Sequence, residues 1–224
     1  MRRLQPWLER VTHVAALVPL AMLIWLASQN QLGPDPVDTL TLRTGKAALN
    51  LLVLSLACTP ISIITGFKGV LPLRRTLGLY AFLYASLHLL TFLVLDYGLN
   101  FGQIIQGITE QPYVIAGLAS FSILFLLAIT STRGWMRRLG KYWKRLHQYV
   151  YLAALLAVLH YFWLIKAEPY EPLIYGGVVV VLLVVRWSPI RRRMSELHIQ
   201  RRTRSRRTDS PSARDAADTP EDRP

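Results

Sequence analysis

The stretch GKYWKRLHQYVYLAALLAVLHYFW, residues 140–163, combines the two features on which the expected fold depends. Three cationic residues precede an uncharged, mostly apolar run at 148–165, with His147 just before it and His160 near its far end. About 20 apolar residues take an α-helix across a bilayer, and a spanning segment must satisfy its own backbone hydrogen bonds, which a helix does. The stretch therefore predicts a transmembrane helix with two histidines at different depths.

Five further apolar runs lie on either side of this one. Together they predict helices at about 11–28, 47–66, 77–95, 113–131, 148–165 and 173–187. Charged or Pro- and Gly-rich segments separate them, such as 33–36 and 168–172. We expect an all-α fold, a six-helix transmembrane bundle that forms one membrane domain over residues 1–198. The sequence shows no evident internal repeat.

The Lys and Arg residues predict the orientation of the bundle. If the N-terminus is cytoplasmic and the helices alternate, all but three of the 26 Lys and Arg fall on the cytoplasmic side, the exceptions being Arg43, Lys46 and Lys166. By the positive-inside rule both termini are then cytoplasmic. Residues 199–224 are basic and contain few apolar side chains, which predicts a disordered cytoplasmic tail that follows anionic lipid headgroups rather than nucleic acid.

The composition narrows the class of protein further. Hydrophobic residues make up 52% of the chain, and its net charge of +13 is spread between the apolar runs instead of forming one basic domain. This pattern indicates a membrane protein and not a nucleic-acid-binding one. The single cysteine, Cys58, excludes a disulfide framework within the chain, a CxxC zinc site and a CxxCH heme attachment. Any heme would be held by packing and axial ligation alone.

Two of the histidines are expected at the same depth. The five histidines are His13, His88, His147, His160 and His198. With a rise of about 1.5 Å per residue, His88 lies roughly 20 Å from Arg75 and His160 roughly 22 Å from Arg145, which places both in the outer half of the membrane. Two neutral imidazoles that face each other are what bis-histidine ligation of heme iron requires. The competing interpretation is that each histidine only hydrogen-bonds a neighbouring hydroxyl or carbonyl group.

The other two candidate ligands lie near the inner surface. His147 is 13 residues from His160, so about 20 Å separates them along one helix and they cannot share an iron. A second heme or another inner-side site remains open, with His13 as a candidate partner or neighbour of His147. His198 is assigned no role. The chain shows no GxGxxG motif and no P-loop. If it moves electrons, both the electron donor and the final acceptor are therefore expected to be separate molecules.

Several segments resemble the MsrQ (YedZ) family of the ferric reductase-like transmembrane superfamily. They are RRTLGLYAFLYASLH at 74–88, residues 140–163, LGPDPV at 32–37, TGKAAL at 44–49 and PLIYGG at 172–177. The resemblance covers about residues 11–187. It implies a b-type cytochrome of the bacterial inner membrane that also carries FMN, with heme iron ligands at His88, His147 and His160.

The same resemblance implies partners and a direction of electron flow. Electrons would come from the quinone pool or a cytosolic flavin reductase and pass to MsrP, a periplasmic molybdenum-cofactor enzyme. That partner reduces methionine sulfoxide in oxidised proteins and restores an apolar side chain. The chain itself would be an electron-transfer subunit, and the catalytic site would lie on the partner.

One position departs from the two-heme members of the superfamily, which carry a second histidine 14 residues before the equivalent of His88. Here that residue is Arg74. The resemblance therefore implies one heme between His88 and His160, while the ligation of a second heme at His147 stays open. Two alternatives also stay open: a stand-alone ferric or quinone reductase with the same cofactors, and a non-redox membrane protein whose histidines are structural.

Overall fold

A computed structural model describes residues 5–165 and 170–186 of the chain, and these contain helices and no β-strand. The helices are α1 (Gln5–Ser28), α2 (Pro36–Thr65), η1 (Lys68–Val70), α3 (Leu73–Leu90), the π-helical η2 (Thr91–Asp96), α4 (Phe101–Glu110), α5 (Pro112–Ile129), α6 (Arg133–Leu139), α7 (Lys141–Leu146), η3 (His147–Tyr149), α8 (Val150–Leu164) and α9 (Tyr170–Arg186). This confirms the all-α prediction. Lys166, His198 and the predicted tail lie outside the described residues.

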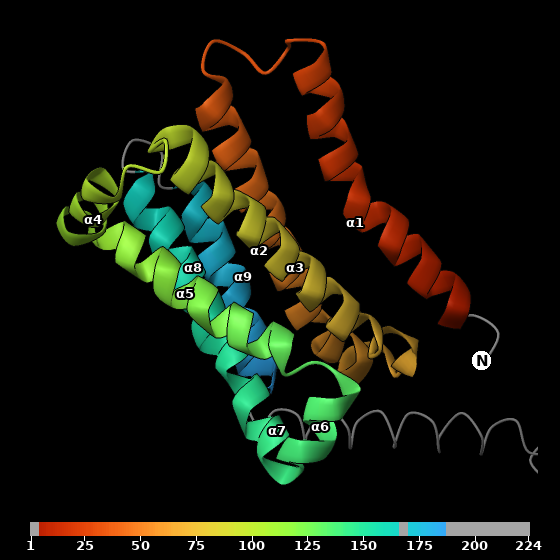
Figure 1. Ribbon diagram of the computed structural model, residues 1–224. Helices are drawn as coiled ribbons and strands as arrows, with labels where there is room; N and C mark the ends of the chain where they lie inside the picture. The colour runs from red at the N-terminus through yellow and green to blue at the C-terminus, as the bar shows by residue number, and fades with distance from the viewer. Residues whose placement is uncertain (1–4, 166–169, 187–224) are drawn as a thin grey trace, which may run out of the picture.

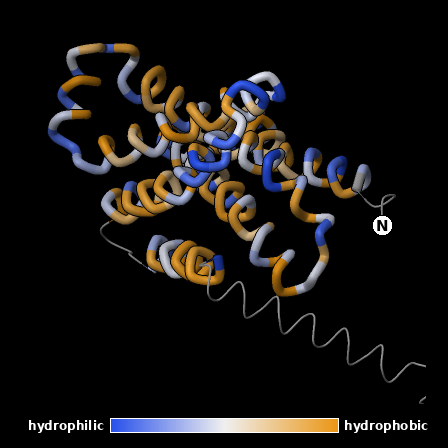
Figure 2. The backbone as a smooth tube through the Cα atoms, turned by 90° about the horizontal axis from the view of Figure 1, so that it is seen from below, coloured by the Kyte–Doolittle hydropathy of each residue, from blue (hydrophilic) through white to orange (hydrophobic). Residues whose placement is uncertain are grey.

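The bundle is built from two pairs of helices with two further helices packed on them (Figure 1). Helices α2 and α3 form one pair, and α5 and α8 form the other. Helix α9 packs against α8 and α2, while α1 lies at the flank and contacts mainly α3. In Figure 2 the helices are mostly hydrophobic, and the hydrophilic residues concentrate in the connections and at helix ends.

Small residues let the two pairs approach closely in the centre of the bundle. Ala81 of α3 and Ala153 and Ala154 of α8 are completely buried, as is the larger Tyr84. Helices in a lipid environment gain little from hydrophobic burial and associate through such close packing and through hydrogen bonds. Close packing of these small residues therefore holds the helices together.

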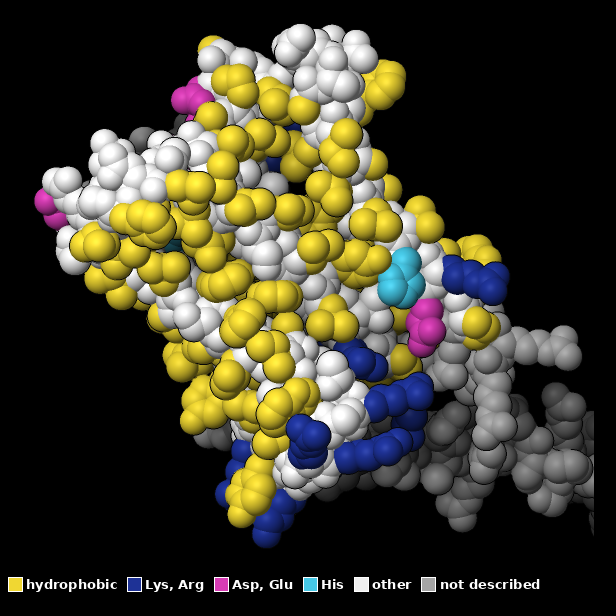
Figure 3. Space-filling view, viewed as in Figure 1, with side chains coloured by type: hydrophobic (Ala, Val, Ile, Leu, Met, Phe, Trp, Pro, Cys, Tyr) yellow, Lys and Arg dark blue, Asp and Glu magenta, His cyan; other side chains and the backbone are white. Residues whose placement is uncertain are grey.

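Four helical segments are long and apolar enough to cross a membrane: Pro6–Ser28, Pro36–Thr65, Lys68–Asp96 and Pro112–Ile129. Helices α8 and α9 are shorter, with 15 and 17 residues, but they lie alongside α5 and α2. Large apolar side chains are spread over the face of the bundle seen in Figure 3, whereas Lys and Arg gather toward the end formed by α6 and α7. This surface is typical of a protein surrounded by lipid.

Helix α2 begins at Pro36, eleven residues before the predicted start. Asp35 caps it, because its carboxylate accepts a hydrogen bond from the backbone N–H of Asp38 at 3.0 Å, and Pro36 fits the first helical turn. The apolar run alone did not reveal this start. Its consequence is that Arg43 and Lys46 lie within the helix, in its first three turns. The short helices α4, α6 and α7 were also absent from the prediction, because they lie in connecting segments.

Tyr84 of α3 connects this helix to α1 by hydrogen bonds to backbone groups of one turn of α1. Its hydroxyl donates to the carbonyl of Ala16 at 2.7 Å and accepts from the backbone N–H of Leu20 at 2.9 Å. In a regular helix that N–H would bond the Ala16 carbonyl directly. The hydroxyl is thus inserted into the helical ladder next to Pro19, whose ring already disrupts this turn of α1.

Replacing Tyr84 with Phe should weaken this junction. Tyr84→Phe leaves the Leu20 N–H and the Ala16 carbonyl without their partner in an apolar region, which costs about 1–3 kcal/mol. We expect a lower midpoint of thermal unfolding in detergent. Tyr80→Phe is the matched control, because the Tyr80 hydroxyl bonds the exposed His13 ring. Equal midpoints for the two variants would contradict the role given to Tyr84.

Candidate functional site

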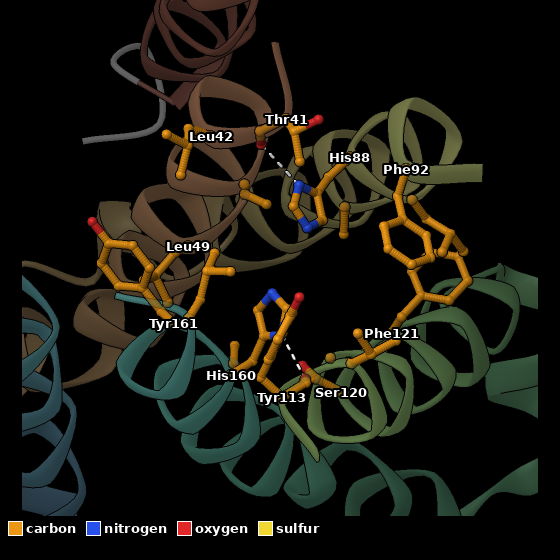
Figure 4. Close-up of a pocket in the computed structure, with 18 of the residues that line it drawn as sticks. Thr41, Leu42, Leu49, His88, Phe92, Tyr113, Ser120, Phe121, His160 and Tyr161 are labelled. Atoms are coloured by element: carbon orange, nitrogen blue, oxygen red, sulfur yellow. Dashed lines mark hydrogen bonds between the residues drawn. The ribbon is translucent and has the colours of Figure 1, made fainter. Parts of the chain in front are cut away.

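A cavity of about 340 Å³ lies between the two helix pairs, lined by residues of α2, α3, α5 and α8. His88 enters it from α3 and His160 from α8, and the two side chains point toward one another across the space (Figure 4). Their ring centroids are 5.9 Å apart, with 79° between the ring planes. The structure thus brings together the two histidines that the sequence places at one depth.

Each of these imidazoles is oriented by a backbone carbonyl of the neighbouring helix. His88 Nδ1 lies 2.9 Å from the carbonyl oxygen of Thr41, and His160 Nδ1 lies 2.7 Å from that of Tyr113. A carbonyl oxygen only accepts, so the proton must lie on Nδ1 of each ring. In the neutral imidazole this leaves the Nε2 lone pair free to bind a metal. The same arrangement orients histidine ligands in many metal sites.

A glycine one turn after each of these carbonyls leaves room for the ring. A Cβ at Gly45 would lie 3.1 Å from His88 Nδ1, and a Cβ at Gly117 would lie 2.8 Å from His160 Nδ1. A methyl group at Gly117 would force the His160 ring to move, and one at Gly45 would require the His88 ring to shift by a few tenths of an ångström. The two glycines are therefore part of the site, although neither carries a functional group.

The two halves of the site repeat one another. Thr41, Gly45 and His88 recur 72 residues later as Tyr113, Gly117 and His160, and both hydrogen-bonded pairs are separated by 47 residues. Five of nine residues are identical between YAFLYASLH at 80–88 and LAALLAVLH at 152–160. The expectation of no internal repeat was therefore wrong. The signal is sparse, because mainly small or apolar packing residues and the histidines are shared.

The cavity fits a heme held between the two imidazoles. A bond from a metal to an imidazole nitrogen is about 2 Å, so two such bonds in line, with roughly 1 Å from each nitrogen to its ring centre, require about 6 Å between centroids. The observed distance is 5.9 Å. The walls are mostly apolar, and the aromatic rings of Phe92 and Phe121 lie on one side (Figure 4). Both the ligand spacing and the lining match the requirements of this cofactor.

A π-helical turn begins three residues after His88, and its Phe92 and Asp96 line the cavity. The backbone N–H of Tyr97 donates to the carbonyl of Phe92, five residues earlier, and the two rings lie 4.6 Å apart. The Thr91 hydroxyl donates to the His88 carbonyl at 2.8 Å. Such wide turns are rare and occur often at functional sites. The sequence run at 77–95 predicted a helix here and gave no signal for the wider turn.

His147 lies outside this cavity, near α7. Its Nδ1 is 3.2 Å from the Trp143 carbonyl, its Nε2 is 3.4 Å from the Ser131 hydroxyl, and the Trp143 ring is stacked on it at 4.0 Å. Among the described residues no second imidazole faces it. The contacts of His147 are therefore hydrogen bonds and ring stacking within the protein.

His13 is also apart from the cavity. Its Nδ1 lies 2.9 Å from the Tyr80 hydroxyl on α3, and its side chain is exposed. Helix α1, which carries His13, runs along the flank opposite α7 (Figure 1). The structure therefore does not bring His13 to His147.

These observations define a class: a multi-pass helical membrane protein with a paired-histidine site between two repeated helix pairs. The family described as the ferric reductase-like transmembrane component matches residues 44–158, which include His88 and both site glycines and end just before His160. The heme-binding subunit MsrQ of the protein-methionine-sulfoxide reductase of Xanthomonas euvesicatoria pv. vesicatoria is 44% identical over 92% of this chain and 94% of its own length. The chain belongs to the MsrQ family of these ferric reductase-like proteins.

Two further relatives have the same description. The MsrQ subunit of Xanthomonas axonopodis pv. citri is 46% identical over 78% of this chain and 83% of its own length. That of Xanthomonas oryzae pv. oryzae (strain MAFF 311018) is 42% identical over 92% of this chain and 94% of its own length. The resemblance seen in the sequence is thereby confirmed.

The glycine beside His160 offers a direct test of the site. Gly117→Ala places a methyl group 2.8 Å from Nδ1, so the ring must move and its bond to the Tyr113 carbonyl must lengthen. We expect weaker heme binding, by about tenfold or more, and a shift of the visible spectrum toward high spin. Gly177→Ala on α9 is the control, because nothing lies within 4 Å of its added Cβ. Indistinguishable spectra of the two variants would contradict this geometry.

Proposed function

We propose that the chain is a b-type cytochrome subunit that carries electrons across the bacterial inner membrane. The observation that supports this most strongly is the pair His88–His160, which face each other at the spacing that iron ligation needs. The relatives of known description are heme-binding subunits of a methionine sulfoxide reductase system. A single cysteine, without a CxxCH motif, favours heme that is held without covalent attachment.

Six segments would cross the membrane in this proposal: α1, α2, α3, α5, α8 and α9. Helices α8 and α9 are short, but they lie along helices that are long enough to span. The described ends of the chain lie at the same end of the bundle as the cationic loop of α6 and α7 (Figure 1, Figure 3). The positive-inside rule then assigns that end to the cytoplasm and the end of the cavity that faces α4 to the periplasm.

Each residue of the site has a defined role. His88 and His160 would bind the iron through Nε2, the carbonyls of Thr41 and Tyr113 would hold the rings in this tautomer, and the cavity walls would exclude water. The heme would supply a reversible one-electron couple. Burial and the hydrogen bonds to the ligands set its reduction potential. We propose one heme in each chain, because His147 has no facing imidazole among the described residues.

The site performs no substrate chemistry in this proposal. Electrons would enter from quinol or a cytosolic flavin reductase, with FMN on the route as the family resemblance implies. They would leave at the periplasmic end to an MsrP-like molybdenum enzyme that reduces methionine sulfoxide. A stand-alone ferric or quinone reductase is the alternative, and the names of the relatives favour the subunit.

Histidine substitutions test the ligation. Purified from heme-replete cells, the protein should contain about one heme per chain, with the narrow reduced α-band of a low-spin bis-imidazole heme. His88→Ala and His160→Ala should each lose this spectrum. His147→Ala and His13→Ala should retain it, because neither ring reaches the cavity. Two hemes per chain, with one lost in His147→Ala, would show that a second ligated site exists.

Reconstitution with the partner tests the proposed role. In proteoliposomes, a quinol or a flavin reductase should reduce the heme without added dithionite. The heme should then be reoxidised when MsrP and a protein that contains methionine sulfoxide are added outside. Reoxidation should fail in His88→Ala, since that variant lacks the iron ligand. Reoxidation by ferric chelates alone, with no response to MsrP, would favour the stand-alone reductase.

A further inference from the structure

A polar cluster of side chains lies beside one edge of the cavity. Lys46 Nζ lies 2.7 Å from Glu171 Oε2, and the Tyr161 hydroxyl donates to the same oxygen at 2.6 Å. Lys46 and Tyr161 both line the cavity. Among the described residues that line it, Lys46 is the only Lys or Arg. From the sequence alone, Lys46 is predicted only to be a cation on the outer side.

The two repeated units differ at this polar cluster. The residue 72 positions after Lys46 is Leu118 on α5, which also lines the cavity. One side of the site therefore has a cation where the related side has an apolar group. In Figure 4 Tyr161 lies on one side of the histidine pair, and the rings of Phe92 and Phe121 lie on the other.

The other charged residues that line the cavity are both acidic. They are Asp38, in the first turn of α2, and Asp96, at the end of the π-helical turn. A carboxylate on a bound ligand would be repelled near either of them and attracted near Lys46. A carboxylate in a mostly apolar cavity also needs a charged or hydrogen-bonding partner, because its burial is otherwise costly.

Lys46 has the donor capacity for a second carboxylate. An ammonium group has three N–H donors, and one of them serves Glu171. Glu171 lies in the first turn of α9, where the helix dipole favours a negative charge, and it also accepts from Tyr161. The Glu171 carboxylate can therefore stay in place while Lys46 bonds a ligand in the cavity.

We propose that Lys46 binds a propionate carboxylate of the heme and so determines which edge of the porphyrin faces α9. This inference rests on the proposed function, which places heme between His88 and His160. The propionate edge would lie at the polar cluster with Lys46 and Tyr161, and the vinyl and methyl edge would face Phe92 and Phe121. Lys46 acts as a binding and positioning residue and not as an iron ligand.

A comparison of two porphyrins isolates this contact. Wild-type and Lys46→Met proteins are each loaded with heme or with heme dimethyl ester, in which both carboxylates are blocked. Transfer to excess apomyoglobin then measures the dissociation rate. With heme, Lys46→Met should dissociate about tenfold faster, the value expected for a lost charged hydrogen bond. With the ester, the two proteins should dissociate at equal rates.

Three variants separate this contact from a structural effect. Arg43→Met removes an exposed cation one turn away on α2, outside the heme cavity, and should leave both rates unchanged. Glu171→Gln breaks the ion pair but leaves Lys46 in place, and it should also dissociate heme at the wild-type rate. Lys46→Arg keeps the charge and should restore slow dissociation.

Each other outcome counts against the assignment. Equal acceleration by Lys46→Met with heme and with the ester, or an effect of Glu171→Gln as large as that of Lys46→Met, would show that Lys46 acts through the fold. No acceleration in Lys46→Met would remove the contact altogether. A wild-type protein that binds neither porphyrin would overturn the proposed function itself. This outcome is recognised before any variant is compared, because the low-spin heme spectrum of the wild type would be absent.

Discussion

The site depends on two hydrogen bonds from imidazole Nδ1 to backbone carbonyls, at Thr41 for His88 and at Tyr113 for His160. Each bond fixes the tautomer of its ring and directs Nε2 into the cavity. In a helix each backbone carbonyl oxygen normally accepts the hydrogen bond of the N–H four residues later. The imidazole must therefore reach the second lone pair of that oxygen from the side of the helix. The adjacent glycine in each helix provides that access. The position of the rings is therefore set by main-chain atoms of two rigid helices, which would suit the proposed electron-transfer site, whose geometry must persist through each redox cycle.

Repetition of one unit explains why the cavity lies where it does. Each unit contributes a carbonyl, a glycine one turn later and a histidine on the next helix of its pair. Two such units packed face to face place the histidines opposite one another, while buried Ala81 and Ala153 occupy equivalent positions in the centre. The units differ at Lys46, whose counterpart in the second unit is Leu118. That difference would allow an otherwise symmetrical pocket to distinguish the two edges of a porphyrin.

Much of this architecture follows from the sequence, because its signals are local. Apolar runs located the long helices, and counting residues along them placed His88 and His160 at the same depth. The early start of α2 was missed because Asp35 and Pro36 extend a helix through charged residues. The contact of Lys46 with Glu171, 125 residues apart, depends on how α9 packs, and no local pattern encodes it. The two carbonyl groups that bond the histidines belong to the backbone, so no side chain in the sequence marks them. The glycines one turn after them do recur, 72 residues apart.

The central claim is that His88 and His160 bind one iron. Pulsed electron paramagnetic resonance of the oxidised protein, grown with ¹⁵N-labelled histidine, measures it most directly. We predict a low-spin ferric heme with two equivalent sets of axial ¹⁵N couplings, and the loss of that species when either histidine is replaced. A ferric heme coupled to a single histidine nitrogen, or one that keeps both couplings without His88 or without His160, would contradict the account.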